Sequence, residues 1–301
     1  MKRRDFIKSS SVLVSLFGST NLLSDTYIND NLENFFYNFF NTNNLKDKNK
    51  EDFKLNNEPK YNDVPKDSIE VVQKPKNIIE DIYVQEQFKE QFLSVRKKLK
   101  LVQTHVGYGN FNIISFDDML KVAKYSKNIG KFTKEELSFL ESIFYYDPTV
   151  HGFFGKRISD NITKAVNKKE VTKIPHTGHY LFKGEPEKTY YKMIEDVRDS
   201  LTLTSGVRII IKQTKLFLDK VHSVDGNLTL ASKSLAPPAY TYHSISDFDV
   251  GKKGFGKANF SSRFALTEEF LKMRKLKYID MRYTVNNKDG VRYEPWHIKI
   301  I

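Results

Sequence analysis

The sequence of 301 residues contains no cysteine, which excludes disulfides, thiolate zinc sites, thiol nucleophiles and lipid attachment through cysteine. Acidic residues are also scarce, because 37 Asp and Glu stand against 49 Lys and Arg and leave a net charge of +12. The hydrophobic content of 39% is too high for a fully disordered chain. The composition therefore predicts a folded protein, and its charge leaves a nucleic acid, a membrane surface or another polyanion open as the partner.

The N-terminus lacks an apolar run long enough for a transmembrane helix, which needs about 20 residues. It begins with MKRRDFIK and continues with the short apolar run Val12–Phe17 before polar residues return. This order predicts an export signal in residues 1–25, and the pair Arg3-Arg4 resembles the twin-arginine export signature. We therefore expect a protein of the periplasm or cell envelope. An ordinary signal that carries two arginines, and an uncleaved signal that tethers the chain to the inner membrane, remain as alternatives.

Residues 26–78 have a different composition, with twelve Asn, eight Lys and nine Asp or Glu. Such a segment buries too little apolar surface to offset its ordering entropy, so we expect an Asn/Lys-rich disordered linker. Of the net charge of +12, residues 1–25 hold +2 and residues 26–78 hold −1, which leaves +11 for residues 79–301. In an exported protein this charge argues against nucleic acid and favours phospholipid headgroups or the carboxylate-bearing peptides of the cell wall.

The next two segments differ in their hydrophobic periodicity. Residues 79–150 predict a helical lead-in, with helical spacing over 79–101 and capping signals for helices over 115–125 and 133–146. Residues 151–301 mix helical spacing with strand alternation, which predicts an α+β domain with an antiparallel sheet and flanking helices. The expected strands are 201–204, 242–250, 278–284 and, after a hairpin turn at 287–290, 291–301; the expected helices are 209–221 and one that begins at Thr267.

Two histidines of this domain stand close to carboxylates, since His243 precedes Asp249 and His297 follows Glu294. A catalytic zinc site has three protein ligands and one open position, so His243, Asp249 and His297 would complete one. Glu294 would then be free to act as a base on the metal-activated water. On a straight strand Glu294 and His297 would face opposite ways, but Pro295 favours a kink that brings both toward one cavity.

The spacing of these residues leaves alternatives open. Asp247 and Asp249 lie two positions apart and would share one strand face, so either could be the ligand. Structural His and Asp residues with satisfied hydrogen bonds would give the same pattern. A further pair, His176 and His179, lies in a segment with proline and glycine that favours a turn, so we interpret it as the edge of a pocket.

Three motifs occur in order along the domain. The first is Ser205-Gly206-Val207-Arg208 with Gln213, and the last is Glu294-Pro295-Trp296-His297. The middle motif runs from Thr241 through His243 to Asp249. It departs from the pattern of the family named below, since Ser246 stands where that pattern has a glycine and the acid falls six rather than seven residues after the histidine. With these motifs, the stretch from about Lys173 to the end resembles the VanY-type D-alanyl-D-alanine carboxypeptidases, which are zinc peptidases of family M15.

This resemblance implies a LAS-type zinc peptidase domain over residues 151–301 that removes the terminal D-alanine from peptidoglycan stem peptides. The implied cofactor is Zn²⁺, and the implied nucleophile is metal-activated water. The implied roles are zinc ligands for His243, Asp249 and His297, general base for Glu294, catalytic substrate anchor for Arg208, and substrate contacts for Gln213 and Trp296. A guanidinium suits either the terminal carboxylate of a peptide or the carbonyl oxygen that becomes negative.

The same site could also serve a peptidoglycan L,D-carboxypeptidase or an endopeptidase. The departures in the middle motif allow a third interpretation, a metal-free protein that only binds wall peptides.

Overall fold

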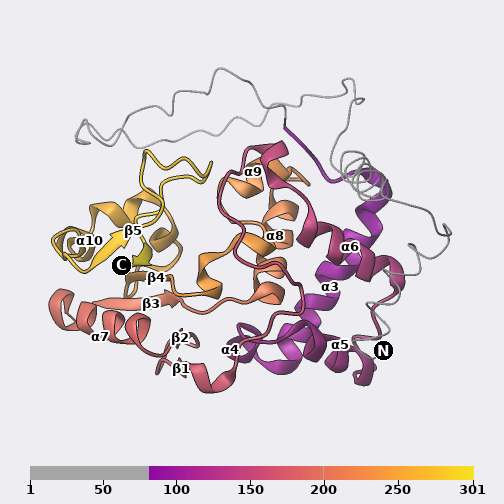
Figure 1. Cartoon of the computed structure of the whole chain (residues 1–301), viewed down its shortest axis with the longest axis horizontal. Coiled ribbons are helices and arrows are strands. Elements are labelled where there is room, and N and C mark those ends of the chain that lie inside the picture. The colour runs from indigo at the N-terminus through magenta and orange to yellow at the C-terminus, as the bar shows by residue number, and fades with distance from the viewer. Residues whose placement is uncertain (1–80, 199) are drawn as a thin grey trace, which may run out of the picture. The chain divides into compact units, whose positions relative to one another are not determined.

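The computed structural model describes residues 81–198 and 200–301 (Figure 1). The export signal expected in residues 1–25 and the linker expected in residues 26–78 lie outside the described residues. Within the described residues, no helix combines the length and the apolar character needed to cross a bilayer.

The lead-in is helical, as predicted. Its elements are η2 (Glu86–Phe88), α3 (Lys89–Val106), α4 (Tyr108–Phe111), α5 (Phe116–Tyr125) and α6 (Lys134–Tyr145). Both predicted N-caps are present, because Ser115 accepts from the backbone N–H of Asp118 and Thr133 forms a reciprocal capping box with Glu136. The first helix begins later than predicted, at Lys89, and runs on to Val106, where Gly107 leaves the helical conformation with a positive φ of 85°.

The remaining residues form small antiparallel sheets with flanking helices, which confirms the predicted α+β class. The elements are η3 (Pro148–His151), η4 (Lys168–Glu170), β1 (Val171–Lys173), β2 (Tyr180–Phe182), α7 (Glu185–Val197), β3 (Leu201–Ser205), α8 (Ile210–Ser223), α9 (Leu228–Ser232), η5 (Pro238–Tyr240), η6 (Tyr242–Ser244), β4 (Phe248–Lys252), η7 (Gly256–Phe260), η8 (Ser262–Leu266), α10 (Glu268–Met273), β5 (Ile279–Met281) and β6 (His297–Ile300). Strands β1 and β2 pair with each other, and the larger sheet has the order β3-β4-β6-β5.

Three predicted strands are shorter than their alternating patterns suggested. In 242–250 the carbonyl of Tyr242 accepts from the N–H groups of the three residues after Ser244, so the chain turns and β4 begins only at Phe248. In 291–301 the N–H of His297 donates to the carbonyl of Glu294, and only β6 is a strand. The strand expected over 278–284 is limited to β5. Local turns therefore take the place of strand pairing directly before β4, which contains Asp249, and directly before β6, which begins at His297.

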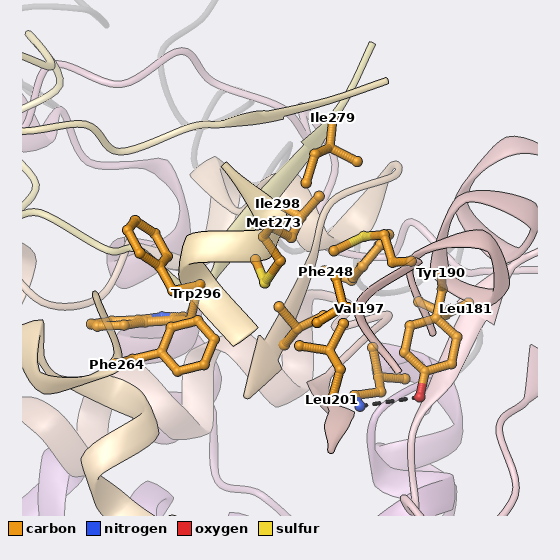
Figure 2. Packing of buried hydrophobic residues seen from close by; sticks show 14 of the residues in the cluster. Leu181, Tyr190, Val197, Leu201, Phe248, Phe264, Met273, Ile279, Trp296 and Ile298 are labelled. Carbon is orange, nitrogen blue, oxygen red and sulfur yellow. Dashed lines mark hydrogen bonds between the residues drawn. The ribbon is translucent and has the colours of Figure 1, made fainter. Parts of the chain in front are cut away.

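One face of the larger sheet packs into a hydrophobic core (Figure 2). Phe248 and Val250 of β4 and Ile298 of β6 lie in this core. Tyr190 of α7 joins it, and its hydroxyl accepts a hydrogen bond from the N–H of Leu203 at 3.2 Å, drawn as a dashed line in Figure 2. Because side chains alternate along a strand, the residues between these core positions face the other side of the sheet.

Helix α8 connects the lead-in with the sheet. It follows β3 after a loop over residues 206–209 and packs against α3 and α5 (Figure 1). The N–H of Ile209 donates to the carbonyl of Asn112 at the end of α4. The lead-in is therefore attached to the loop that contains Arg208.

Candidate active site

The register of the sheet brings Asp249 and His297 together. They are direct partners across β4 and β6, on the face opposite the core residues Phe248 and Ile298. A register shift in β3 after Leu203 sets Ser205 opposite Asp249. Such bulges redirect the end of a strand, and here the bulge leads the chain from the core face into the loop with Arg208.

The orientation of His243 depends on Gly206. The N–H of Val207 donates to the carbonyl of Tyr180 at 2.7 Å, and a Cβ on Gly206 would lie 2.0 Å from that carbonyl oxygen. Only glycine allows this close approach of two backbones. The carbonyl of Gly206 then accepts from Nδ1–H of His243 at 2.9 Å, which assigns the proton to Nδ1 and leaves Nε2 with a free lone pair.

Three buried side chains converge on one point. His243, Asp249 and His297 each offer one ligand atom, and these atoms lie within 4.8 Å of one another. Oδ1 of Asp249 is 3.3 Å from Nε2 of His243 and 3.3 Å from Nδ1 of His297. Nε2 of His243 and Oδ1 of Asp249 are buried without an aligned hydrogen-bond partner. Buried polar atoms without partners are costly, and a metal ion between them would satisfy both, so the residues fit a metal.

Asp247 lies on the other side of His297 and is not part of this cluster. Its Oδ2 accepts from Nε2 of His297 at 3.0 Å, and its Oδ1 accepts from Nη2 of Arg282 at 3.0 Å. The guanidinium of Arg282 also stacks over the ring of Tyr242 at 3.5 Å. Asp247 therefore orients His297 so that Nδ1 faces the cluster, while Asp249 supplies the carboxylate oxygen of the cluster.

The electrostatics of the two histidines differ. Burial, followed by the nearby charge of Arg208, lowers the pKa of His243 to about 4, so this imidazole is neutral and can bind a metal. Burial alone would lower the pKa of His297, but hydrogen bonds with Asp247 and Glu294 raise it to about 9 in the metal-free protein. Metal binding would displace the proton from Nδ1 of His297.

Glu294 lies beside the cluster and outside the ligand set. Its Oε2 is 3.6 Å from Nδ1 of His297, because the turn after Pro295 brings the two side chains to the same side. Burial raises the pKa of Glu294 above its ordinary value. A carboxylate with a raised pKa is a better proton acceptor, which suits a general base.

The three predicted substrate contacts lie in different surroundings. Arg208 is buried, with Nη2 3.4 Å from Oδ2 of Asp249 and with Nε lacking a partner. Gln213 is buried on α8, where its Nε2 donates to the carbonyl of Ala236 at 2.6 Å. Trp296 lies in the hydrophobic core, next to Phe264 in Figure 2. Arg208 thus adjoins the candidate metal cluster, whereas the substrate-binding roles of Gln213 and Trp296 stay predictions.

Sequence reasoning missed two features of the site. The first is the pair of Asp247 and Arg282, because their spacing of 35 residues gives no local signal. The second is Asn112 from the lead-in, which donates through Nδ2 to the carbonyl of Gly178 at 3.2 Å. His179 lies in the turn that was expected there, and its Nδ1 is 3.4 Å from Nδ2 of Asn112.

The family model that matches the chain is VanY, D-alanyl-D-alanine carboxypeptidase, over residues 186–301. The predicted resemblance is confirmed over that segment. The VanY segment contains all four cluster residues, His243, Asp249, Glu294 and His297, and it starts after the lead-in and the turn with His179. No curated protein matches the chain.

Several solved structures resemble the chain at low sequence identity. The LdcB LD-carboxypeptidase is 18% identical with a TM-score of 0.40, and the match covers 51% of this chain and 78% of that one. The D,D-dipeptidase VanXYg with a D-Ala-D-Ala phosphinate analogue is 19% identical with a TM-score of 0.36, over 40% and 50% of the two chains. A mutant D,D-pentapeptidase VanY in complex with Zn(II) is 18% identical with a TM-score of 0.33, over 44% and 78%.

Proposed function

We propose that residues 151–301 form a zinc-dependent D-alanyl-D-alanine carboxypeptidase that trims peptidoglycan stem peptides. One observation carries the proposal: His243, Asp249 and His297 meet, two of their buried ligand atoms lack partners, and all three lie in the VanY segment. Two imidazoles with one carboxylate form a ligand set typical of catalytic zinc, whereas magnesium and calcium prefer oxygen ligands alone.

The chain's own residues transfer the protons and hold the substrate. A bound zinc ion would supply Lewis acidity to the scissile carbonyl and to the attacking water. Glu294 takes a proton from that water and delivers it to the leaving amine, since its raised pKa suits both transfers. Arg208 holds the terminal carboxylate of the peptide or the oxygen of the carbonyl as it becomes negative.

The test is hydrolysis of purified muropeptides, with the products identified by mass spectrometry. The zinc-loaded chain should release one D-alanine from stems that end in D-Ala-D-Ala. Glu294→Gln should lower the rate by about 10²–10⁴-fold and keep its zinc, because Glu294 transfers protons and is not a ligand. The matched control Glu268→Gln changes an exposed residue on α10 and should keep full activity. Unchanged hydrolysis by Glu294→Gln would contradict the assignment.

The same assay separates the alternatives. Release of a D-alanine from stems that lack the D-Ala-D-Ala end would identify an L,D-carboxypeptidase, and cleavage of cross-linked dimers would identify an endopeptidase. A chain without stoichiometric zinc that still binds stems and releases nothing would be a wall-peptide-binding protein.

We also propose that the chain acts in the periplasm or cell envelope after export by the twin-arginine route. The support is the sequence of residues 1–25, with its arginine pair and short apolar run. Replacement of Arg3 and Arg4 together by lysine should retain the protein inside the cell. Normal export of that variant would point to another route.

A further inference from the structure

The first turn of α8 has an excess of positive charge. Arg208 precedes the helix, Lys212 lies in its first turn, and no acidic residue is present there. Ile209, the N-cap, provides no side-chain hydrogen bond to the free N–H groups. The helix macrodipole adds positive potential at the same end. Arg208 is buried, its Nη2 lies 3.4 Å from Oδ2 of Asp249 and its Nε has no partner, so the helix start holds more positive charge than this one carboxylate balances.

Lys212 differs from the other lysine nearby. Lys215 pairs with Asp219 on the same helix at 2.5 Å. Lys212 is half-buried, and within residues 81–198 and 200–301 no carboxylate lies within ion-pair distance of it. Its Nζ lies 6.0 Å from the ring centre of Phe111 in α4. A half-buried cation against an aromatic ring, without a counter-ion, is suited to bind an anion.

The residue that follows α4, Asn112, contacts His179. Asn112 directly follows Phe111, and its Nδ2 lies 3.4 Å from Nδ1 of His179. Because Nδ2 is a donor, Nδ1 of His179 accepts, and its proton lies on Nε2. Nε2 makes no hydrogen bond within the described part of the chain, so it is available to a ligand. Lys212 and His179 thus lie beside two consecutive residues, Phe111 and Asn112, at the end of α4.

The protonation states support this arrangement. Burial, with the nearby charges of Arg208 and Lys215, lowers the pKa of Lys212 to about 8, so the ammonium is still mostly charged at neutral pH. Burial, with the nearby charges of Lys212 and Arg208, lowers the pKa of His179 to about 4, so the imidazole is a neutral donor. The placement itself comes from the backbone, because the N–H of Ile209 donates to the carbonyl of Asn112 and the N–H of Val207 donates to the carbonyl of Tyr180, which follows His179.

The charges of the chain's own residues favour an anionic group at this place. Lys212 carries a positive charge and has no carboxylate at ion-pair distance within the described residues. A peptide with only its terminal carboxylate would leave Lys212 without a counter-ion after desolvation, which is unfavourable.

We propose that Lys212 and His179 form a subsite for a second carboxylate of the substrate, on a residue upstream of the scissile bond. The proposal rests on the proposed function and adds the substrate class, a peptide with two free carboxylates. Lys212 supplies the charge, and His179 donates from Nε2. Asn112 is a positioning residue from the lead-in, which lies outside the VanY segment.

Binding of two synthetic stem pentapeptides tests the subsite. Both end in D-Ala-D-Ala, and they differ only in a free carboxylate or a carboxamide on the upstream acidic residue. The protein is the full zinc-loaded chain with Glu294→Gln, so that binding is measured by calorimetry without turnover. We expect the carboxylate peptide to bind about tenfold more tightly, as one charge-assisted hydrogen-bonded contact provides.

The variants then assign this preference to Lys212. Lys212→Met retains an apolar side chain against Phe111 and should reduce the preference to less than about twofold. Lys212→Arg should retain most of it. The matched control Lys220→Met, near the end of α8, should keep the full preference.

Equal affinity of the parent protein for the two peptides would overturn the subsite. A preference that Lys212→Met leaves intact would overturn it as well, and so would failure to bind either peptide. Failure of the proposed function is a separate result, because it would appear as intact peptides after incubation with the zinc-loaded wild-type chain.

Discussion

Two buried carboxylates of this chain, Glu136 in the lead-in and Asp249 in the sheet, have opposite surroundings. Both oxygens of Glu136 accept hydrogen bonds, from Ser94 at 2.5 Å, from Lys98 at 2.6 Å and from the N–H of Thr133 at 2.8 Å. Oδ1 of Asp249 is buried without an aligned donor, 3.3 Å from Nε2 of His243. Both oxygens of Glu136 are satisfied by the protein itself, whereas Oδ2 of Asp249 accepts from Arg208 and Oδ1 is open to a ligand.

The contrast between Glu136 and Asp249 separates a carboxylate that stabilises the fold from one that is placed to bind. A satisfied buried carboxylate joins elements, and Glu136 joins α3 to the cap of α6. A buried carboxylate oxygen without a donor lowers the stability of the fold and is retained where function needs it. Changes around Glu136 should therefore affect unfolding, and changes around Asp249 should affect metal binding and catalysis.

Among substitutions around these two carboxylates, the largest effect on activity should come from Arg208, which adjoins Asp249. Arg208→Met should lower kcat/KM for a D-Ala-D-Ala peptide by about 10²–10³-fold, because it removes the charge that we propose faces the substrate. Steady-state kinetics measure the loss, and zinc content should remain at the wild-type level. Arg263→Met, at an exposed position, is the control. Activity within a few-fold of wild type would remove Arg208 from the catalytic machinery.

A smaller effect, on zinc affinity, should follow from replacing Asp247, which orients His297 from outside the cluster. Asp247→Asn should weaken zinc affinity by about 10–100-fold, as replacement of such an outer partner typically does. Competition with a chromophoric chelator measures the affinity. Asp280→Asn changes an exposed carboxylate of the same sheet and should leave the affinity unchanged. Equal affinities for the two variants would show that Asp247 does not support the metal.

The smallest effect, on the free energy of unfolding, should follow from replacing Glu136. Glu136→Gln should lower the free energy of unfolding by about 1 kcal/mol at pH 7, since it weakens a charged hydrogen-bonded contact. Urea denaturation in the presence of a chelator measures this difference. Glu135→Gln, on the exposed side of the same turn, is the control and should cost less.

The pH dependence gives a second check on Glu136. Burial alone would raise the pKa of Glu136, but hydrogen bonds from Lys98, Ser94 and Thr133 lower it below its ordinary value of 4.5. A lowered pKa in the folded state stabilises above the ordinary value, and the stabilisation is lost as the pH falls through the lowered value. The difference between wild type and Glu136→Gln should be constant from pH 7 to about 4.5 and shrink below it. A difference that grows on acidification would contradict the role of Glu136.

The same two regions differ in how well the sequence predicted them. The lead-in helices at Ser115 and Thr133 have caps that act within four residues, so local pattern was sufficient. The strand expected over 242–250 was wrong in its first half, because the carbonyl of Tyr242 closes a turn that residue alternation does not reveal.

The candidate site was predicted only in part, because local sequence patterns do not reveal contacts between residues far apart in the chain. The His243, Asp249 and His297 set came from motifs and spacing, and the structure brings the three together. The choice between Asp247 and Asp249 required the sheet register, since only Asp249 is the cross-strand partner of His297. Asn112 lies far from the motifs in sequence and reaches the site only through the packing of the lead-in.

Zinc titration tests the central claim most directly. Calorimetry on the metal-free full chain should show one zinc ion per chain, and saturation at about 100 times the dissociation constant should stabilise the fold by about 2.7 kcal/mol. Glu294→Gln should bind the same amount, and His243→Ala should lose this binding because it removes one of three ligands. Absence of stoichiometric zinc in the wild-type chain, or equal binding by His243→Ala, would contradict the assignment of this cluster as a zinc centre.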